Sequence, residues 1–204
     1  MHRDTANPRI LRANDHDLIR RGIRVLLPRF VAFLRAINVG GNRVVKMDFL
    51  RQVFESLGFS RVETFIASGN VVFDTGARNP KMLERKIEKK LREALGYDVA
   101  TFIRTPTELK EIAGFEPFRQ SQMHDGAGIN IIFLADAVDE KSKRKVLALR
   151  TDTDEFRVRG REIYWLRRRQ PGKDFSTVPL EKALRRPFTI RGANTVRKLA
   201  AKYA

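Results

Sequence analysis

The side chains of this sequence that could do chemistry are arginines, amides, hydroxyls and carboxylates. Its 204 residues contain no cysteine and three scattered histidines, His2, His16 and His124. The lack of cysteine excludes disulfides, thiolate metal sites and a cysteine nucleophile. The scattered histidines argue against a zinc site and against a histidine triad. We therefore expect no metal and no cofactor, and the sequence leaves open whether the protein is an enzyme.

Arg35 and the turn that follows it are the first candidates for binding an anion. An arginine inside an apolar strand needs a carboxylate, a group of carbonyls or an anionic ligand. Either an internal salt bridge or a ligand would therefore explain Arg35. Asn38, Gly40 and Gly41 come next, and their backbone amides could converge on an anion or could form only a turn. No Gly-Lys-Ser/Thr follows, which excludes a Walker loop.

Four more polar residues at the ends of predicted elements join these candidates. Ser68 and Asn70 flank a glycine between two strands, where polar side chains also satisfy backbone groups. Arg191 and Asn194 precede or open the last helix, which Asn194 could simply cap. The anion-binding candidates are thus Arg35, Asn38, Gly40, Gly41, Ser68, Asn70, Arg191 and Asn194.

The densest basic and aromatic stretch gives a second set of candidates, for nucleic acid. On a hairpin, alternate arginines could face phosphates while an aromatic ring stacks on a base. An edge strand guarded by charge would have the same composition, and both interpretations stay open. The nucleic-acid-binding candidates are Arg159, Arg161, Trp165, Arg167, Arg168, Arg169 and Lys173. The RNA-recognition motif itself is absent, because residues 68–73 lack its basic-glycine-aromatic pattern.

The charge of the whole chain favours an anionic partner. Lysine and arginine total 41 against 24 acidic residues, which gives a net charge of +17, and such a field attracts polyanions. An arginine-rich proteome would explain the same excess. No apolar run is long enough to span a membrane, and the first residues lack a secretory signal. We therefore expect a cytoplasmic protein without a membrane partner.

Local patterns predict a first half with the order βαββαβ. Apolar runs bounded by turn residues predict strands, and apolar residues at spacings of three and four predict helices. The predicted elements are a strand over Val31–Ile37, a helix over Met47–Leu57, a hairpin of Val62–Ile66 and Val71–Phe73, a helix from Asn79-Pro80 to Gly96, and a strand over Val99–Ile103. This order is typical of a ferredoxin-like α+β fold with an antiparallel sheet.

The rest of the chain repeats that plan in element order rather than in sequence. We predict a helix over Thr107–Ala113, a strand over Gly128–Leu134, a helix over Asp139–Leu149, a hairpin across Gly160, and helices over Pro179–Leu184 and Ala193–Ala201. The expected domains are an N-terminal extension (1–29) with a short helix over Asp15–Leu27 or no order, and two ferredoxin-like halves (30–105 and 106–204). Because both faces of the first strand are apolar, the second half or another subunit should cover its outer face.

Four motifs resemble the domain of unknown function 1697 family. LRAINVGG at 34–41 is similar to its L-R-G-I-N-V-G-G signature, and ASGNVVF at 67–73 is similar to Q-S-G-N-V-V-F. TIRGANTV at 189–196 resembles T-T-R-N-W-N-T-V, and GREIY at 160–164 resembles G-R-E-V-Y. The resemblance runs from about residue 30 to the C-terminus. It implies two ferredoxin-like halves, an occurrence largely in bacteria, and no established activity.

The departures from the family pattern affect what can be transferred. Ala36 replaces a family glycine, which we interpret as a small change within a strand. Gly192-Ala193 replaces an Asn-Trp pair, and the family's basic G-R-S-K-L stretch is poorly matched at 172–176. A function that depends on that tryptophan or that lysine is therefore in doubt. The first 29 residues lie outside the pattern, so translation could begin after Met1.

Three functions are consistent with these residues. The first is a binding module whose basic surface contacts a phosphate-bearing partner, foremost nucleic acid. The second is an enzyme for a small anionic substrate, with Arg35 and the turn at 38–41 holding the anion and Asn70 orienting a water, although no general base is evident. The third is a structural or interaction protein whose charge is incidental. The sequence predicts neither the oligomeric state nor the type of nucleic acid.

Overall fold

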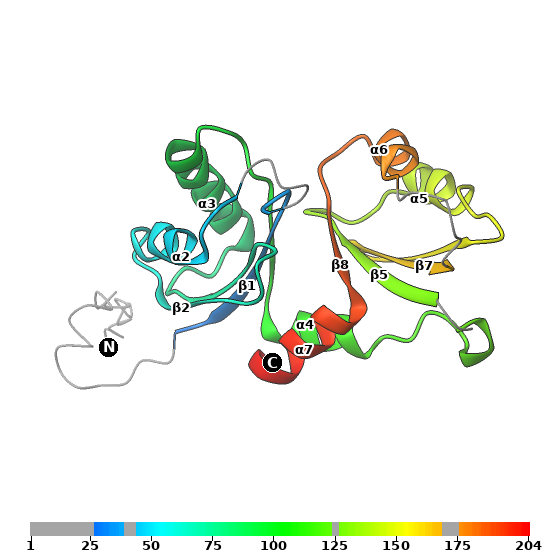
Figure 1. Cartoon of the computed structure of the whole chain (residues 1–204), viewed down its shortest axis with the longest axis horizontal. Coiled ribbons are helices and arrows are strands. Elements are labelled where there is room, and N and C mark those ends of the chain that lie inside the picture. The colour runs from blue at the N-terminus through cyan, green and yellow to red at the C-terminus, as the bar shows by residue number, and fades with distance from the viewer. Residues whose placement is uncertain (1–26, 39–43, 124–126, 169–175) are drawn as a thin grey trace, which may run out of the picture.

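The chain forms two four-stranded antiparallel sheets with helices, as the computed structural model in Figure 1 shows. The structure describes residues 27–38, 44–123, 127–168 and 176–204. The α+β architecture with two ferredoxin-like halves is confirmed. The predicted helix over Asp15–Leu27 lies outside the described residues except for Leu27, which is not helical. None of the helices within the described ranges is long and apolar enough to cross a membrane.

The first half has the predicted order of elements. It consists of β1 (Arg29–Leu34), α2 (Met47–Glu55), β2 (Ser60–Thr64), β3 (Asn70–Asp74), α3 (Pro80–Leu95) and β4 (Thr101–Arg104). The strands lie in the order β2-β3-β1-β4. Local signals set the bounds of α3: the Asn79 side chain accepts hydrogen bonds from two backbone amides at its start, and Gly96 ends it with a φ of 76°.

The second half repeats the arrangement. It consists of α4 (Pro106–Gly114), a 3₁₀ turn (Gln120–Gln122), β5 (Ala127–Phe133), α5 (Glu140–Leu147), β6 (Asp154–Arg159), β7 (Glu162–Arg168), α6 (Val178–Leu184), β8 (Thr189–Gly192) and α7 (Ala193–Tyr203). The strand order β6-β7-β5-β8 matches that of the first sheet. β8, which the sequence analysis did not predict, completes this sheet as the counterpart of β4.

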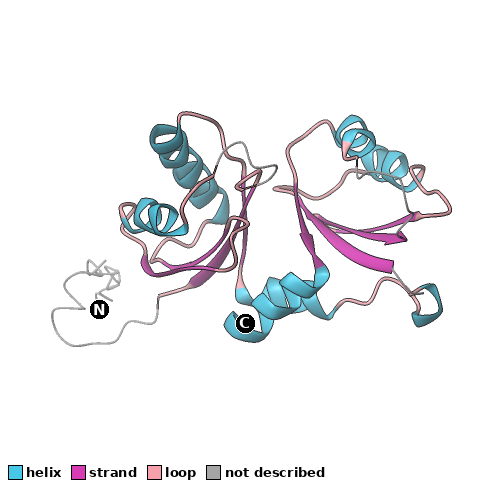
Figure 2. Cartoon of the chain, viewed as in Figure 1, coloured by secondary structure: helices cyan, strands magenta, loops and turns pink. Residues whose placement is uncertain are grey.

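Each sheet is covered on both faces. α2 and α3 cover the outer face of the first sheet, and α5 and α6 cover that of the second (Figure 2). The inner faces contribute to a central core together with α4 and α7, which lie side by side between the halves (Figure 2). β1 serves both cores, because Ala32 faces its own helices while Phe33 faces the second half. The second half thus covers the outer face of the first strand, which was one of the two covers predicted for it.

The first strand ends earlier than predicted, and this changes the interpretation of two residues. β1 stops at Leu34, and residues 35–38 form a turn. Ala36 and Asn38 have φ values of 57° and 56° in this turn. The prediction of Arg35 within a strand is therefore wrong. Ala36 was expected on a strand, but it lies in this turn with a left-handed backbone. Glycine, the family residue at this position, is favoured in that conformation.

The registers of the two sheets allow a comparison of the halves residue by residue. The two central strands pair with their neighbours in the same way. The residues that occupy equivalent places are Phe33 and Phe133, Asn70 and Glu162, Arg104 and Arg191, and Leu34 and Leu134. The rings of Phe33 and Phe133 stack with centroids 4.1 Å apart. The halves therefore contact each other through equivalent faces.

Candidate anion-binding site between the two halves

Arg191 on β8 joins the second half to the first. Its five N–H groups all donate to neutral acceptors: the side chains of Asn70 (2.6 Å) and Thr189 (2.7 Å), and the carbonyls of Leu34, Ser68 and Ile190 (each 2.8 Å). The residue is buried, and no carboxylate of the described residues forms an ion pair with it. Burial lowers the pKa of Arg191 to about 10. At neutral pH the side chain is therefore a buried cation, and the described part of the chain gives it no anionic partner.

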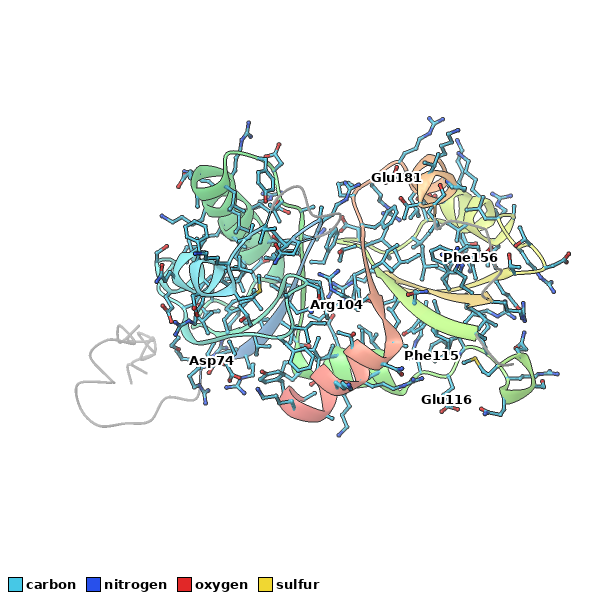
Figure 3. All side chains as sticks on the ribbon, viewed as in Figure 1. Asp74, Arg104, Phe115, Glu116, Phe156 and Glu181 are labelled. Carbon is cyan, nitrogen blue, oxygen red and sulfur yellow. The ribbon has the colours of Figure 1, made fainter. Side chains whose placement is uncertain are left out.

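Arg104 on β4 makes the equivalent contacts in the opposite direction. It is fully buried between the sheets (Figure 3). Its Nη2 donates to the carbonyl of Leu134, as Arg191 does to that of Leu34, both at 2.8 Å. Its Nε, however, donates to the carboxylate of Glu162 at 2.7 Å. One of the two equivalent arginines thus has a counterion, and the other has an amide in the same place.

The helices that follow the two arginines also differ in whether a carboxylate is present in their first turn. α4 and α7 each begin two residues after their arginine. At α4, the side chain of Thr105 accepts from the amide of Glu108, and the Glu108 carboxylate accepts from the amide of Thr105. At α7, the cap is Gly192, which has no side chain to bond the free amides, and the third helical residue is Thr195. The first turn of α7 therefore lacks both the cap and the carboxylate that α4 has.

A cavity of about 390 Å³ opens beside Arg191. It lies between the two halves, with the turn after β1 on one side and α6, β8 and α7 on the other. Its lining comprises Leu34, Arg35, Ala36, Ile37, Ser68, Thr177, Glu181, Phe188, Thr189, Ile190, Arg191, Gly192 and Thr195. Two cations and one carboxylate are present among these residues.

Acidic residues line the equivalent edge of the molecule. The cavity there is smaller, about 220 Å³, and its lining includes Glu108, Glu111 and Glu162 with two arginines. Glu108 forms an ion pair with Arg161. Counting the described lining residues, carboxylates thus balance the charge at this edge, whereas positive charge is in excess beside Arg191.

Arg35 lies at the mouth of the larger cavity. Its Nη2 is 3.4 Å from a carboxylate oxygen of Glu181 on α6, and the two side chains are 43% and 46% exposed. Figure 3 labels Glu181 near the gap between the halves. Such long, exposed pairs contribute little to stability. An incoming anion could therefore replace Glu181 as the partner of Arg35 at small cost.

The structure brings four of the eight predicted anion-binding residues together. Arg35, Ser68 and Arg191 line the cavity, and Asn70 supports Arg191 from behind. Asn38 instead holds the turn, since its side chain exchanges two hydrogen bonds with the backbone of Val45 (2.7 and 3.0 Å). Asn194 is exposed on α7 and accepts from Arg197. Gly40 and Gly41 lie outside the described residues.

The predicted nucleic-acid residues occupy varied environments. Trp165 is 4% exposed, and its ring packs on Phe156 while its Nε1 donates to Asp154 at 2.6 Å. Stacking of a base on Trp165 would therefore require the core to open. The arginines contact their own half: Arg159 lies over the Phe115 ring, Arg161 pairs with Glu108, Arg167 lies over the Trp165 ring, and Arg168 bonds the carbonyl of Asp152. Arg169 and Lys173 lie outside the described residues.

Sequence reasoning missed several residues that shape the site. Glu181, Thr189 and Thr195 line the cavity, and Arg104 with Glu162 forms the equivalent pair. One signal was available: a repeated βαββαβ plan needs a fourth strand after the helix near residue 184, and residues 189–192 are the segment left for it. That strand would have put Arg191 beside the central strand of its sheet.

Comparison with known proteins agrees with this fold. A sequence model of the family described as "Protein of unknown function (DUF1697)" matches residues 27–164. No curated protein matches the chain. The solved structure of the conserved bacterial protein SP0830 from Streptococcus pneumoniae is similar, with a TM-score of 0.67 and 24% identity over 86% of this chain and 98% of that chain. Because the family match spans more than half of the chain, this protein belongs to the DUF1697 family of proteins of unknown function.

Proposed function

We propose that this protein binds a small anion in the cavity between its two halves. The observation that carries the proposal is the contrast between Arg191 and Arg104. Both are buried at equivalent positions, but Arg104 bonds the Glu162 carboxylate while Arg191 bonds only neutral groups beside an open cavity. A buried charge is costly without an opposite one. An anion in the cavity would supply the compensation that Glu162 supplies at the other edge.

The residues around the cavity would have different roles. Arg35 would bond the anion directly, since its ion pair with Glu181, the one it forms within the described residues, is weak. Ser68 accepts a bond from Asn70 at 3.0 Å, which leaves its hydroxyl hydrogen for a ligand. The uncapped first turn of α7 favours negative charge. Arg191 would act through its charge, because its N–H groups are already used.

Binding without catalysis is the form of this proposal that the lining favours. Among the described residues that line the cavity there is no histidine, and the one carboxylate, Glu181, faces Arg35. General acid–base catalysis needs a proton-transferring group within reach of the substrate. The enzyme hypothesis therefore has less support than a ligand-binding role. We keep the cytoplasm as the proposed location.

Titration calorimetry of the intact protein with small carboxylates and phosphates tests this function. Arg35→Leu removes the direct cation and should weaken binding at least tenfold. Arg92→Leu is the matched control, because Arg92 forms an exposed pair with Asp98 and neither residue lines the cavity. Equal binding by both variants, or no binding by any form of the protein, would contradict the proposal.

Non-specific nucleic-acid binding is a second candidate, supported by the net charge of +17. Fluorescence anisotropy with single-stranded RNA should detect binding at low salt that falls steeply as salt rises. Arg167→Ser/Arg168→Ser should not change this binding much if the whole field is responsible. A large, salt-resistant loss in that variant would instead make the hairpin of β6 and β7 a dedicated surface.

A further inference from the structure

We infer that the ligand is an amphipathic organic acid, with one carboxylate and an apolar body. This inference rests on the proposed function and specifies its ligand. The cavity presents two different surfaces to a ligand, a cationic one and an apolar one. The class of molecule follows from the need to satisfy both.

The apolar surface forms much of the cavity. Its members are Leu34, Ala36, Ile37, Phe188 and Ile190, of which Ala36 is exposed and Ile190 is half-buried. Ligand sites of a few hundred Å³ are typically apolar, with a few polar groups that orient the ligand. Inorganic phosphate would leave this lining uncovered. An apolar body would cover it and remove it from water.

The cationic surface lies next to the apolar one. The guanidinium carbon of Arg35 is 6.0 Å from the centroid of the Phe188 ring. A carboxylate that pairs with Arg35 would therefore place its own apolar body close to Phe188. A single acid group is enough, since Glu181 already offsets one of the two arginines.

Asn70 would determine whether the cavity accepts an acid. It does not line the cavity but bonds the Nε of Arg191, in the place where Glu162 bonds Arg104. Asn70→Asp would place a carboxylate on Arg191 and cancel the charge that attracts the ligand. We expect at least a tenfold loss of acid affinity, because the carboxylate cancels the charge of Arg191 and can also accept the Ser68 hydroxyl hydrogen that the ligand would use.

A series of straight-chain acids from acetate to octanoate tests the inference in the intact protein by titration calorimetry. Affinity should rise by up to about fourfold for each methylene, equivalent to about 0.8 kcal/mol, until the cavity is full. Inorganic phosphate is the comparison ligand. Circular dichroism melts verify that Asn70→Asp and Arg35→Leu are folded. Arg35→Leu should lose affinity for every acid, while Arg92→Leu should follow the unmodified protein.

The outcomes separate this inference from the proposed function. An affinity that rises with chain length, and that is lower in both Asn70→Asp and Arg35→Leu, would support the inference. Binding of phosphate and acetate as strongly as octanoate, with loss in Arg35→Leu, would overturn the ligand class and leave the anion site standing. If the affinity rises with chain length equally in every variant, the binding is purely apolar, and this result would overturn the role of both arginines. No binding in any arm would overturn both proposals.

Discussion

Glu162→Gln would convert the surroundings of Arg104 into those that Arg191 already has. The Arg104 side chain is fully buried, the Glu162 side chain is 11% exposed, and the two are 2.7 Å apart. Removing one partner of a buried ion pair costs about 3–5 kcal/mol, because the other charge stays buried. The glutamine oxygen still accepts from Nε, and two carbonyls still accept from Arg104. We therefore expect the lower end, about 3 kcal/mol.

Urea denaturation measures this change directly. Trp165 is the only tryptophan of the sequence and is buried in the core of the second half, so its fluorescence should report the unfolding of that half. The urea midpoint should fall without a change in slope, which marks a change in stability alone. Glu108→Gln is the matched control: its pair with Arg161 is more exposed, and glutamine can keep the bond to the Thr105 amide.

The control variant Glu108→Gln should lower the free energy of unfolding by no more than about 1 kcal/mol, as is usual for ion pairs at the surface. A loss below about 1 kcal/mol in Glu162→Gln, or equal losses in both variants, would refute the reasoning. Arg104 would then not need its counterion. That no described carboxylate pairs with Arg191 would then no longer support an anion site beside it.

Three further predictions concern the backbone and pH. Ala36→Gly should stabilise the protein by up to about 1 kcal/mol in urea denaturation, because Ala36 has a φ of 57°; a loss of stability would contradict this. Gly69→Ala should destabilise it by more than about 1 kcal/mol, since Gly69 has a φ of 69° and an added Cβ would lie 2.9 Å from the Cβ of Ile37. Burial raises the pKa of Glu84 above 4.5, although its carboxylate accepts from the Ile103 amide. The native state thus holds this proton more tightly, so the Glu84 contribution to stability is lost as pH rises through the raised pKa. Glu84→Gln should gain stability relative to the unmodified protein over that rise, and a difference that is independent of pH would exclude this cause.

The secondary structure could be predicted well because its signals are local. The cap at Asn79, the left-handed glycine at 96 and the apolar period of α3 lie within one segment of chain. The same is true of the hairpin across Gly160. β8 was missed for the complementary reason. Its four residues include an arginine and a glycine, and only pairing with β5 makes them a strand.

The candidate site could be predicted only in part. Arg35, Ser68, Asn70 and Arg191 could be chosen as polar residues at the ends of elements, but not as one group. The burial of Trp165 could not be predicted, because a tryptophan on a strand can face either the core or the solvent. The strand register places it inward, next to Phe156.

The sequence by itself determined the order of the elements, the two-half plan and the excess of positive charge, since each depends on composition or on nearby residues. Only the tertiary structure decided which charges meet. Arg191 bonds groups 121 and 157 positions away in the sequence. The difference between Glu162 and Asn70 became meaningful only when the registers made these residues equivalent. Long-range pairing thus decides where the charge of this protein is compensated and where it remains open to a ligand.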